Sequence, residues 1–288
     1  MRPLICVSKC SRTSVRIGRA PPYREDEVRA IRVKGNYNSK NKHTINYLKN
    51  LRIKSIMSSD PSHIAIILDG NRRWARSQGL ASFKGHEEGV SKVEKLMEWA
   101  KDLGVRELTL YAFSTENFKR PKKEVEYLMG IFLKEFEKLS NSEDLKEKGV
   151  RIRAIGRLWM FPPKVQQAIT KIMEQTKSNR KHTVNFALAY GGRQEILDGV
   201  RKIAEMVKFN DVDPKEITEK MITQSLYLCS EPDIVIRPGG EKRMSNFLIW
   251  QSNYSEWFFL DKYWPEFSKN DLKRVIEGYK ERQRRFGS

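Results

Sequence analysis

From residue 62 onward, continuous apolar runs alternate with segments in which apolar residues recur every three or four positions. Continuous runs are typical of strands buried on both faces of a sheet. Residues 63–68 form such a continuous run, and apolar runs of β-type residues predict further strands at 107–113, 150–156, 183–190, 232–237 and 255–260. The helical spacing predicts helices at about residues 86–102, 121–139, 162–175, 194–208, 214–226 and 268–285. Together these elements predict an α/β fold, a mostly parallel six-stranded central sheet flanked by helices on both faces.

The ends of three predicted strands carry arginine, glycine and small polar residues. Ligands of such sheets bind at the carboxyl ends of the strands, which here lead into residues 69–74, 114–120 and 237–246. Glycine lets backbone N–H groups approach an anion, and arginine offers forked donors that match phosphate oxygens. A lone carboxylate among these cations, Asp69, suits a Mg²⁺ ion between it and a phosphate. No GxxxxGK[ST] loop and no GxGxxG after a strand is present, which disfavours P-loop and dinucleotide sites.

Each of these residues also has a plain structural interpretation. Asp69 suits the capping of a helix that follows it, and the neighbours Arg72 and Arg73 suit a solvated face. A single histidine such as His86 caps or packs more often than it binds a ligand, and an aromatic residue such as Phe118 belongs to the core more often than to a site. The recurrence of arginine beside glycine, serine and asparagine after three separate strands favours diphosphate binding.

The composition adds a strong positive charge. The 288 residues carry a formal net charge of +19, which indicates an anionic partner such as a phosphorylated metabolite, a membrane surface or a nucleic acid. Residues 1–60 hold 14 Lys and Arg against 4 Asp and Glu, so about half of the excess lies in that segment. The rest of the chain is moderately basic and contains no recognised nucleic-acid module, so we expect no nucleic-acid partner.

The cysteines and the apolar runs bear on localisation. Three cysteines without paired metal-ligand spacing indicate a reducing compartment; they are Cys6, Cys10 and Cys229. The longest apolar runs fall far short of the ~18–20 residues of a membrane span, so we expect a cytoplasmic protein. Residues 1–57 are interpreted as a basic N-terminal extension, with a transit peptide or a misplaced start before Met57 as alternatives, and residues 58–288 as the folded domain.

Several strings closely resemble the cis-prenyltransferases, the family of undecaprenyl and other polyprenyl diphosphate synthases. They are HIAIILDGNRRWA, GHEEG, LTLYAFSTENFKRP, YGGRQEI, DIVIRPGGEKRMSNFLIWQSNYSEWFF, WPEF and RRFG, and they cover about residues 62–287 in order. Arginine rather than glycine at position 72 resembles the archaeal and eukaryotic branch. The resemblance identifies residues 58–288 as a cis-prenyltransferase catalytic domain.

The resemblance implies a transferase that condenses isopentenyl diphosphate onto geranylgeranyl or farnesyl diphosphate, with a Z double bond in each new unit. The product would be a long polyprenyl diphosphate, a precursor of a glycosyl carrier lipid. The family further implies Mg²⁺ as cofactor, a homodimer and an apolar tunnel, for which the stripes at residues 86–102 and 121–139 are candidates. An apolar product also implies transient contact with a membrane surface, to which the basic N-terminal segment would contribute.

The resemblance also implies a role for each matching residue. Asp69 is the catalytic carboxylate that handles Mg²⁺, Glu256 contributes to the metal site, and Asn117 acts in catalysis by positioning rather than as a base. The allylic diphosphate is surrounded by Gly70, Asn71, Arg72, Arg73, Trp74 and His86. The reacting groups are lined by Ser114, Thr115, Glu116, Phe118 and Arg120. Isopentenyl diphosphate is bound by Arg237, Arg243, Met244 and Ser245. The closing motif reaches the site of a neighbouring subunit through Arg285 and Gly287.

One position departs from the family. Where most members have an arginine, this chain has Ser82, and Lys84 and Arg76 are candidates to replace its phosphate contact. Some members are non-catalytic partner subunits that have lost the aspartate, whereas this chain keeps Asp69 and Arg73 together with the closing motif, which favours a self-sufficient homodimer. The sequence leaves open the product length, the preferred primer and whether released diphosphate or a carboxylate accepts the proton.

Overall fold

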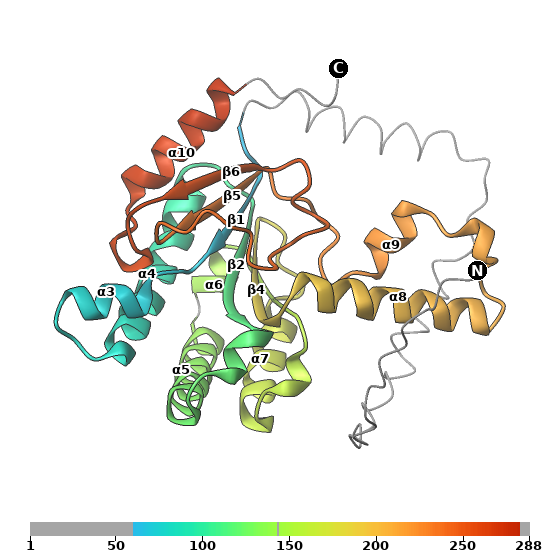
Figure 1. Ribbon diagram of the computed structural model, residues 1–288, viewed down its shortest axis with the longest axis horizontal. Coiled ribbons are helices and arrows are strands. Elements are labelled where there is room, and N and C mark those ends of the chain that lie inside the picture. Colours follow the sequence, from blue (N-terminus) through green and yellow to red (C-terminus); the bar gives the residue numbers. More distant parts are fainter. Residues whose placement is uncertain (1–59, 143, 283–288) are drawn as a thin grey trace, which may run out of the picture. The chain divides into compact units, whose positions relative to one another are not determined.

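The computed structural model describes residues 60–142 and 144–282, and its framework is a six-stranded sheet (Figure 1). All strand pairs are parallel, in the order β3-β4-β2-β1-β5-β6. The strands are β1 His63–Ile67, β2 Glu107–Ser114, β3 Val150–Ile155, β4 His182–Tyr190, β5 Ile234–Pro238 and β6 Glu256–Leu260. The predicted α/β fold is confirmed, and each strand begins and ends within two residues of its predicted bounds. The predicted boundary between residues 57 and 58 is outside the described residues.

The helices connect the strands in the predicted order. They are α3 Asn71–Ser77, α4 Ser82–Asp102, α5 Lys122–Ser140, α6 Asp144–Glu147, α7 Pro163–Thr176, α8 Gly192–Lys208, α9 Glu219–Ser225 and α10 Lys269–Glu281. The single helix predicted at residues 214–226 is instead a 3₁₀ turn followed by α9. Asp213 and Thr218 each accept a backbone N–H, so each begins a helical segment of its own. α3 and α6 are too short to show an apolar stripe, and the predicted end of the last helix at residue 285 is outside the described residues.

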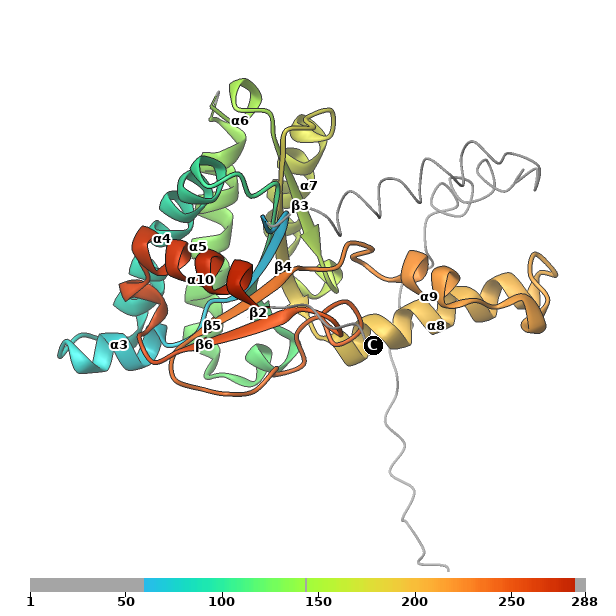
Figure 2. The same ribbon diagram turned by 90° about the horizontal axis from the view of Figure 1, so that it is seen from above.

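The two faces of the sheet are covered differently. On one face, apolar side chains of α4, α5, α7 and α10 pack on the sheet and form the larger core around Ile66 and Leu110. There α5 lies beside α7, and α10 lies beside α4 (Figures 1 and 2). On the other face, a smaller core is closed by loop residues, with Phe247 stacked on Tyr111 at a ring-centroid distance of 4.6 Å. In the described part of the chain, loops thus take the place of the predicted second helix layer.

Helices α8 and α9 pack against each other and extend away from the sheet (Figures 1 and 2). The outer surface of α8 carries two apolar side chains, Leu197 and Val200, that are 45% and 50% exposed. None of the helices formed by the described residues has the length and apolar character needed to cross a membrane.

Three glycines allow close packing at the end of β1. Gly70 has a φ of +98°, and a Cβ atom there would lie 2.7 Å from the ring of Tyr263. A Cβ atom on Gly85 of α4 would lie 2.0 Å from the backbone oxygen of Asn71, and one on Gly89 would lie 2.5 Å from the Asn71 side chain. The missing side chains therefore let α4 touch the first residue of α3 and fix its position.

We expect Gly85→Ala to lower the free energy of unfolding by roughly 2 kcal/mol or more, because the added methyl group would collide with backbone. Gly130→Ala, in α5, is the matched control. Its Cβ atom would meet open space, so this change should raise stability by about 0.5–1 kcal/mol. Urea unfolding followed by circular dichroism measures both, and a Gly85→Ala protein as stable as Gly130→Ala would contradict the packing.

Candidate functional site

Asp69 follows β1 with its carboxylate between two arginines. Its Oδ2 accepts a hydrogen bond from Arg237 at 2.7 Å, and its Oδ1 lies 3.2 Å from the guanidinium of Arg73. The N–H of Gly70 donates to the same Oδ1 at 2.7 Å, and Gly70 rather than Asp69 is the N-cap of α3. The helix-cap interpretation of Asp69 is therefore wrong, and its carboxylate serves the arginines at the strand ends.

Arg237 lies in β5, next to β1, and is only 3% exposed. One of its terminal nitrogens binds Asp69, while the other donates to the hydroxyl of Ser245 at 2.6 Å and to the backbone oxygen of Arg243. Its Nε has no hydrogen-bond partner among the described residues. Arg237 is thus a buried charge, balanced by Asp69, that holds the loop after β5 in place.

That loop also contacts Arg73. The guanidinium of Arg73 donates to the backbone oxygen of Gly239 at 2.7 Å. Gly239 has a φ of +104°, and a Cβ atom there would lie 2.9 Å from Arg73. Further along the loop, Arg243 and Met244 are exposed, and Arg243 forms an ion pair with Glu241 at 2.5 Å. The residues predicted to bind isopentenyl diphosphate are therefore gathered beside the segment predicted to bind the allylic diphosphate.

A second group of cations meets at Glu124, in the first turn of α5. His86 and Arg120 lie 3.3 and 3.2 Å from its Oε1, and Arg72 lies 3.7 Å from its Oε2. Burial, and then the charge of Arg120, lowers the pKa of His86 below its usual 6.5 although Glu124 opposes the shift. The imidazole is therefore neutral at pH 7. The sequence prediction missed Glu124, whose one signal is its spacing of four residues from Arg120.

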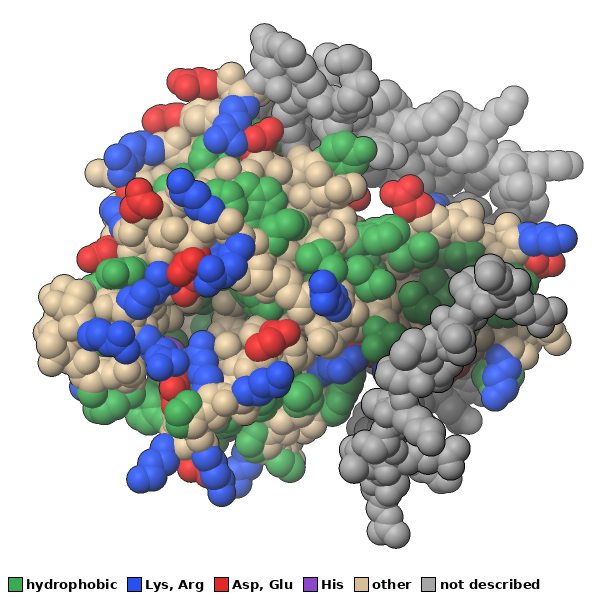
Figure 3. All heavy atoms as spheres, in the orientation of Figure 1, with side chains coloured by type: hydrophobic (Ala, Val, Ile, Leu, Met, Phe, Trp, Pro, Cys, Tyr) green, Lys and Arg blue, Asp and Glu red, His purple; other side chains and the backbone are tan. Residues whose placement is uncertain are grey.

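A cleft of about 310 Å³ lies between these two groups. It is lined by Leu68, Asp69, Gly70, Asn71, Arg72, Arg73, Arg76, His86 and Arg120. Arg72 and Arg73 are partly solvated, with side chains 45% and 38% exposed, and both also line the cleft. Of the two candidates to replace the arginine missing at Ser82, Arg76 lines the cleft, whereas Lys84 pairs with Glu87 at 2.8 Å on the surface. Figure 3 shows basic side chains gathered over the region of α3 and α4. Four arginines against one carboxylate suit a ligand with several negative charges.

The segment after β2 is a 3₁₀ helix, Thr115–Lys119. Two of the site residues predicted there stabilise the segment itself. The side-chain oxygen of Asn117 accepts the N–H of Ser114 at 3.0 Å in a capping box. The ring of Phe118 packs edge-on against Phe113 with centroids 4.9 Å apart, at the margin of the larger core. Asn117 is thus an oriented amide rather than a free base, and Phe118 is in part a core residue.

Asn246, which the sequence prediction missed, joins this segment to the loop after β5. Its Oδ1 accepts the N–H of Arg193 at 2.9 Å, and its Nδ2 donates to Gln194 at 3.1 Å and to Glu116 at 3.4 Å. Its φ of +63° is one that asparagine tolerates. The nearby Thr115 hydroxyl is buried without a partner among the described residues. The three strand-end loops are therefore one connected unit.

Glu256 is separated from this unit. It pairs in register with Ile234, which pairs with Ile64, so it lies at the amino end of the sheet. Asp69 is at the opposite end, roughly 15 Å away along the strands. Glu256 is instead paired with Arg282 at 2.6 Å. Within one chain Glu256 therefore does not reach Asp69, and its predicted part in a metal site stays a prediction.

One predicted site residue of α3, Trp74, does not line the cleft. Trp74 is half-buried on α3 and lines none of the cavities described for this part of the chain. The closing-motif residues Arg285 and Gly287 are outside the described residues, so their predicted contact with a neighbouring subunit stays a prediction.

The donor set around Asp69 fits a Mg²⁺ ion that is shared with a ligand. In residues 60–142 and 144–282, no three His, Cys, Asp or Glu side chains are grouped so that they form a complete metal site. Mg²⁺ is usually held by one or two carboxylates, with phosphate oxygens and water completing its coordination. Asp69 is 28% exposed and lines the cleft, so it suits that arrangement as a single protein ligand.

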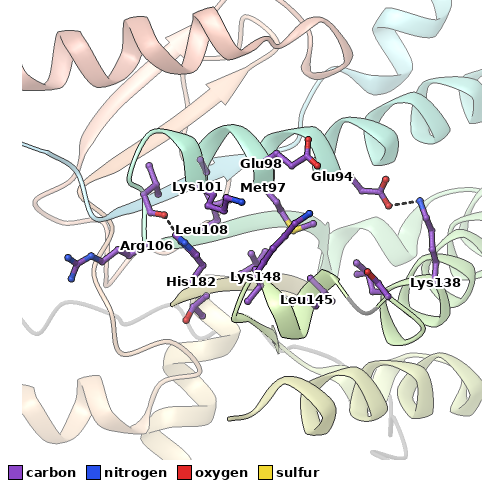
Figure 4. A pocket seen from close by; sticks show the side chains of 17 residues that line it. Glu94, Met97, Glu98, Lys101, Arg106, Leu108, Lys138, Leu145, Lys148 and His182 are labelled. Atoms are coloured by element: carbon purple, nitrogen blue, oxygen red, sulfur yellow. Dashed lines mark hydrogen bonds and ion pairs between the residues drawn. The ribbon is translucent and has the colours of Figure 1, made fainter. Parts of the chain in front are cut away.

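Two further cavities lie on the helix-covered face of the sheet, and one of them adjoins the cleft. The first, of about 90 Å³, is mainly apolar and shares three lining residues with the cleft: Leu68, Asn71 and His86. The second, of about 260 Å³, shares three with the first: Glu94, Met97 and Leu139. Figure 4 shows this second cavity, with Glu94 paired to Lys138 at 2.5 Å on one side and His182 on another. A mainly apolar cavity thus adjoins the cationic cleft, whereas the predicted tunnel stays a prediction.

Known proteins resemble the chain over about four fifths of its length. The family model described as "putative undecaprenyl diphosphate synthase" matches residues 67–287. A tritrans,polycis-undecaprenyl-diphosphate synthase (geranylgeranyl-diphosphate specific) of Methanocaldococcus jannaschii is 50% identical over 231 residues, which are 79% of this chain and 82% of the relative. An isoprenyl transferase of Thermus thermophilus is 45% identical over 79% of this chain and 89% of its own length.

Solved structures show the same fold. The lavandulyl diphosphate synthase of Lavandula x intermedia, in complex with dimethylallyl diphosphate, superposes with a TM-score of 0.75 at 35% identity, over 80% of this chain and 99% of that chain. A probable undecaprenyl diphosphate synthase from Campylobacter jejuni gives a TM-score of 0.67 at 34% identity over the same shares.

The cleft predicts binding of inorganic pyrophosphate in the presence of Mg²⁺. We expect Arg120→Ala to weaken this binding about tenfold or more, because it removes a charge-assisted donor from the cleft wall. The control is Lys122→Ala, which removes an equal charge two positions further along the chain. The Lys122 side chain is 91% exposed and lies outside the cleft, so this change should leave the affinity for pyrophosphate unchanged. Isothermal titration calorimetry measures both, and equal losses in the two variants would speak against the cleft.

Proposed function

The chain belongs to the undecaprenyl diphosphate synthase family, the cis-prenyltransferases, and we propose that it elongates an allylic diphosphate with isopentenyl diphosphate, forming a Z double bond in each new unit. The observation that carries the proposal is the cationic cleft at Asp69 with an apolar cavity directly adjoining it. Substrates and product of this reaction combine a diphosphate with an apolar chain. The proposed product is a long polyprenyl diphosphate, a precursor of a glycosyl carrier lipid.

Geranylgeranyl diphosphate is the proposed primer. Several relatives at 45–50% identity bear names that specify this primer, among them the enzyme of Methanocaldococcus jannaschii. Farnesyl diphosphate, which is one isoprene unit shorter, is the competitor to compare. A comparison of kcat/KM for the two primers decides between them.

The chemical step is departure of diphosphate from the allylic carbon and attack on that carbon by the double bond of isopentenyl diphosphate. Negative charge grows on the departing oxygen, and fixed cations that face it stabilise the transition state. Arg72, Arg73, Arg76 and Arg120 surround the cleft in which that oxygen would lie. Arg237, with Arg243 and Ser245, would hold the second diphosphate close by and so orient its double bond toward the same carbon.

Asp69 would hold Mg²⁺ against the allylic diphosphate. Bound there, the ion supplies charge neutralisation and Lewis-acid polarisation of the phosphate oxygens. The carboxylate is oriented for this by Arg237, by Arg73 and by the N–H of Gly70, which leave part of it open to the cleft. Glu256 has no part in this proposal for one chain, since it lies at the other end of the sheet.

Bond formation leaves a proton to be removed from the isopentenyl unit. The amide oxygen of Asn117 is engaged by the N–H of Ser114, and an amide is a weak base, so we assign Asn117 a positioning role. The released diphosphate is the proposed proton acceptor, because it is formed in the cleft at the moment when the proton must leave. With the diphosphate as acceptor, the step requires no protein side chain to change its protonation state.

The growing chain is proposed to follow the cavities between α4 and α5. Met97 and Leu139 line both cavities, so they lie where the proposed route passes from one to the other. The larger cavity lies near the amino ends of β2, β3 and β4, the far end of the sheet from Asp69. The product would stop growing when its chain fills the route from the cleft to this cavity, so the length of the route would set the length of the product.

A homodimer and transient membrane contact complete the proposal. Leu197 and Val200 on α8, and Trp159 after β3, are 45–50% exposed, which supports burial against a second copy of the chain. A polyprenyl product is far too apolar to remain in water, which supports delivery to a membrane surface from a protein that otherwise resides in the cytoplasm.

The first prediction from this proposal concerns activity. We expect the wild-type protein with Mg²⁺, labelled isopentenyl diphosphate and geranylgeranyl diphosphate to form butanol-extractable product, and Asp69→Asn to lower kcat roughly 10²- to 10³-fold because the metal-holding charge is lost. Asp211→Asn, at an exposed position after α8, is the charge-matched control and should keep full activity. Equal yields from wild type and Asp69→Asn would refute the proposed role.

The second prediction concerns product length. We expect Met97→Trp to shorten the products by one or more isoprene units, because the indole would fill the passage between the two cavities. Lys95→Trp places the same ring on an exposed position of α4 outside both cavities and should leave the length unchanged. Reversed-phase chromatography of the dephosphorylated products measures their chain length. Products of wild-type length from Met97→Trp would exclude this route.

A further inference from the structure

Glu124 contacts the cations of the cleft without lining the cleft itself. Its carboxylate lies 3.2 Å from Arg120, 3.3 Å from His86 and 3.7 Å from Arg72, all of which are lining residues. Asp69, in contrast, is part of the cleft wall. Glu124 therefore stands behind the cations, on the side away from the ligand.

The three cations come from three different elements. Arg72 belongs to α3, His86 belongs to α4, and Arg120 ends the 3₁₀ helix that precedes α5. Glu124 lies in the first turn of α5, where the helix dipole favours a negative charge. Its side chain is only 16% exposed, so water screens its ion pairs less than those of a surface carboxylate. One carboxylate thus joins the three segments that form this side of the cleft.

An ordinary ion pair on the same helix provides the contrast. Glu126 lies 3.8 Å from Lys122, and their side chains are 64% and 91% exposed. Such a pair connects two positions of one helix and contributes little. Glu124 instead holds two long arginine side chains that repel each other and that a diphosphate would otherwise have to order on binding.

We propose that Glu124 is a positioning residue of the allylic diphosphate cleft, which fixes the guanidinium groups of Arg72 and Arg120 and the ring of His86 in the arrangement that receives the substrate. The proposal rests on the proposed function, because it names the ligand of the same site. Glu124 takes no part in the isopentenyl diphosphate side, where Arg237 and Ser245 are held by Asp69 and by each other.

Loss of the Glu124 carboxylate changes the affinity for a diphosphate in two opposite ways. It leaves the arginines without an orienting partner, which weakens productive binding. It also removes a negative charge from beside a cationic cleft, which strengthens the general attraction of a diphosphate. We expect the loss of arginine orientation to outweigh the gain in general attraction. Weaker diphosphate binding after loss of the carboxylate therefore supports a positioning role, and tighter binding contradicts it.

The experiment compares Glu124→Gln, Glu124→Asp and the control Glu126→Gln in the full-length chain with Mg²⁺. We expect Glu124→Gln to lower kcat/KM for geranylgeranyl diphosphate at least tenfold while the KM for isopentenyl diphosphate stays within twofold. Glu124→Asp, which keeps the charge on a shorter side chain, should recover at least half of the loss on a logarithmic scale. Glu126→Gln should match the wild type in every parameter.

A second measurement does not depend on turnover. Calorimetric titration with inorganic pyrophosphate should show at least fivefold weaker binding to Glu124→Gln than to the wild type, with thermal unfolding confirming that both are folded. Unchanged or tighter pyrophosphate binding, or equal changes in the KM values of both substrates, would overturn the positioning role. An inactive wild type that still binds pyrophosphate more tightly than Glu124→Gln would refute the proposed reaction and keep the role of Glu124.

Discussion

The ion pair between Asp69 and Arg237 is the interaction on which the site depends. β1 and β5 are parallel neighbours, so the residues after one strand necessarily meet the end of the other. Arg237 is almost fully buried, and a buried charge without a partner costs several kcal/mol, about 3–5 when a pair is broken. Asp69 supplies the balancing charge and remains partly open to the cleft. The same carboxylate therefore stabilises the sheet end and presents a negative charge among cations.

Trp264 connects this pair to the rest of the fold. Its backbone N–H donates to the backbone oxygen of Asp69 at 2.9 Å, and its indole N–H donates to that of Gly89 in α4 at 2.7 Å. Trp264 is fully buried, so neither bond is exchanged with water. The chain after β6, the end of β1 and the middle of α4 are thus held at fixed distances, and Asn71 is held between them by the glycines of α4.

The sequence was sufficient for the sheet and for most of the cleft, for one physical reason. The strands are rich in apolar β-forming residues and the loops after them are polar, so the strand ends are visible in the pattern, and parallel topology then brings residues 69–74, 114–120 and 237–246 together. Glu124 was missed because its importance comes from side chains of three elements that meet only in the folded chain. The position of Glu256 could not be predicted for a related reason: a family motif gives a role, whereas only the strand register shows which end of the sheet a residue occupies.

The contrast between the cleft and the cavity beside it explains the state of His86. This residue lines both, together with Leu68 and Asn71, so it stands at the boundary between a space that favours anions and one that favours hydrocarbon. A charged imidazole would be unfavourable on the apolar side and would add to the repulsion among the arginines, and burial and Arg120 accordingly lower its pKa. A neutral ring still offers a hydrogen bond to Glu124 on one side. The boundary between the cleft and the apolar cavity therefore carries no uncompensated imidazolium charge.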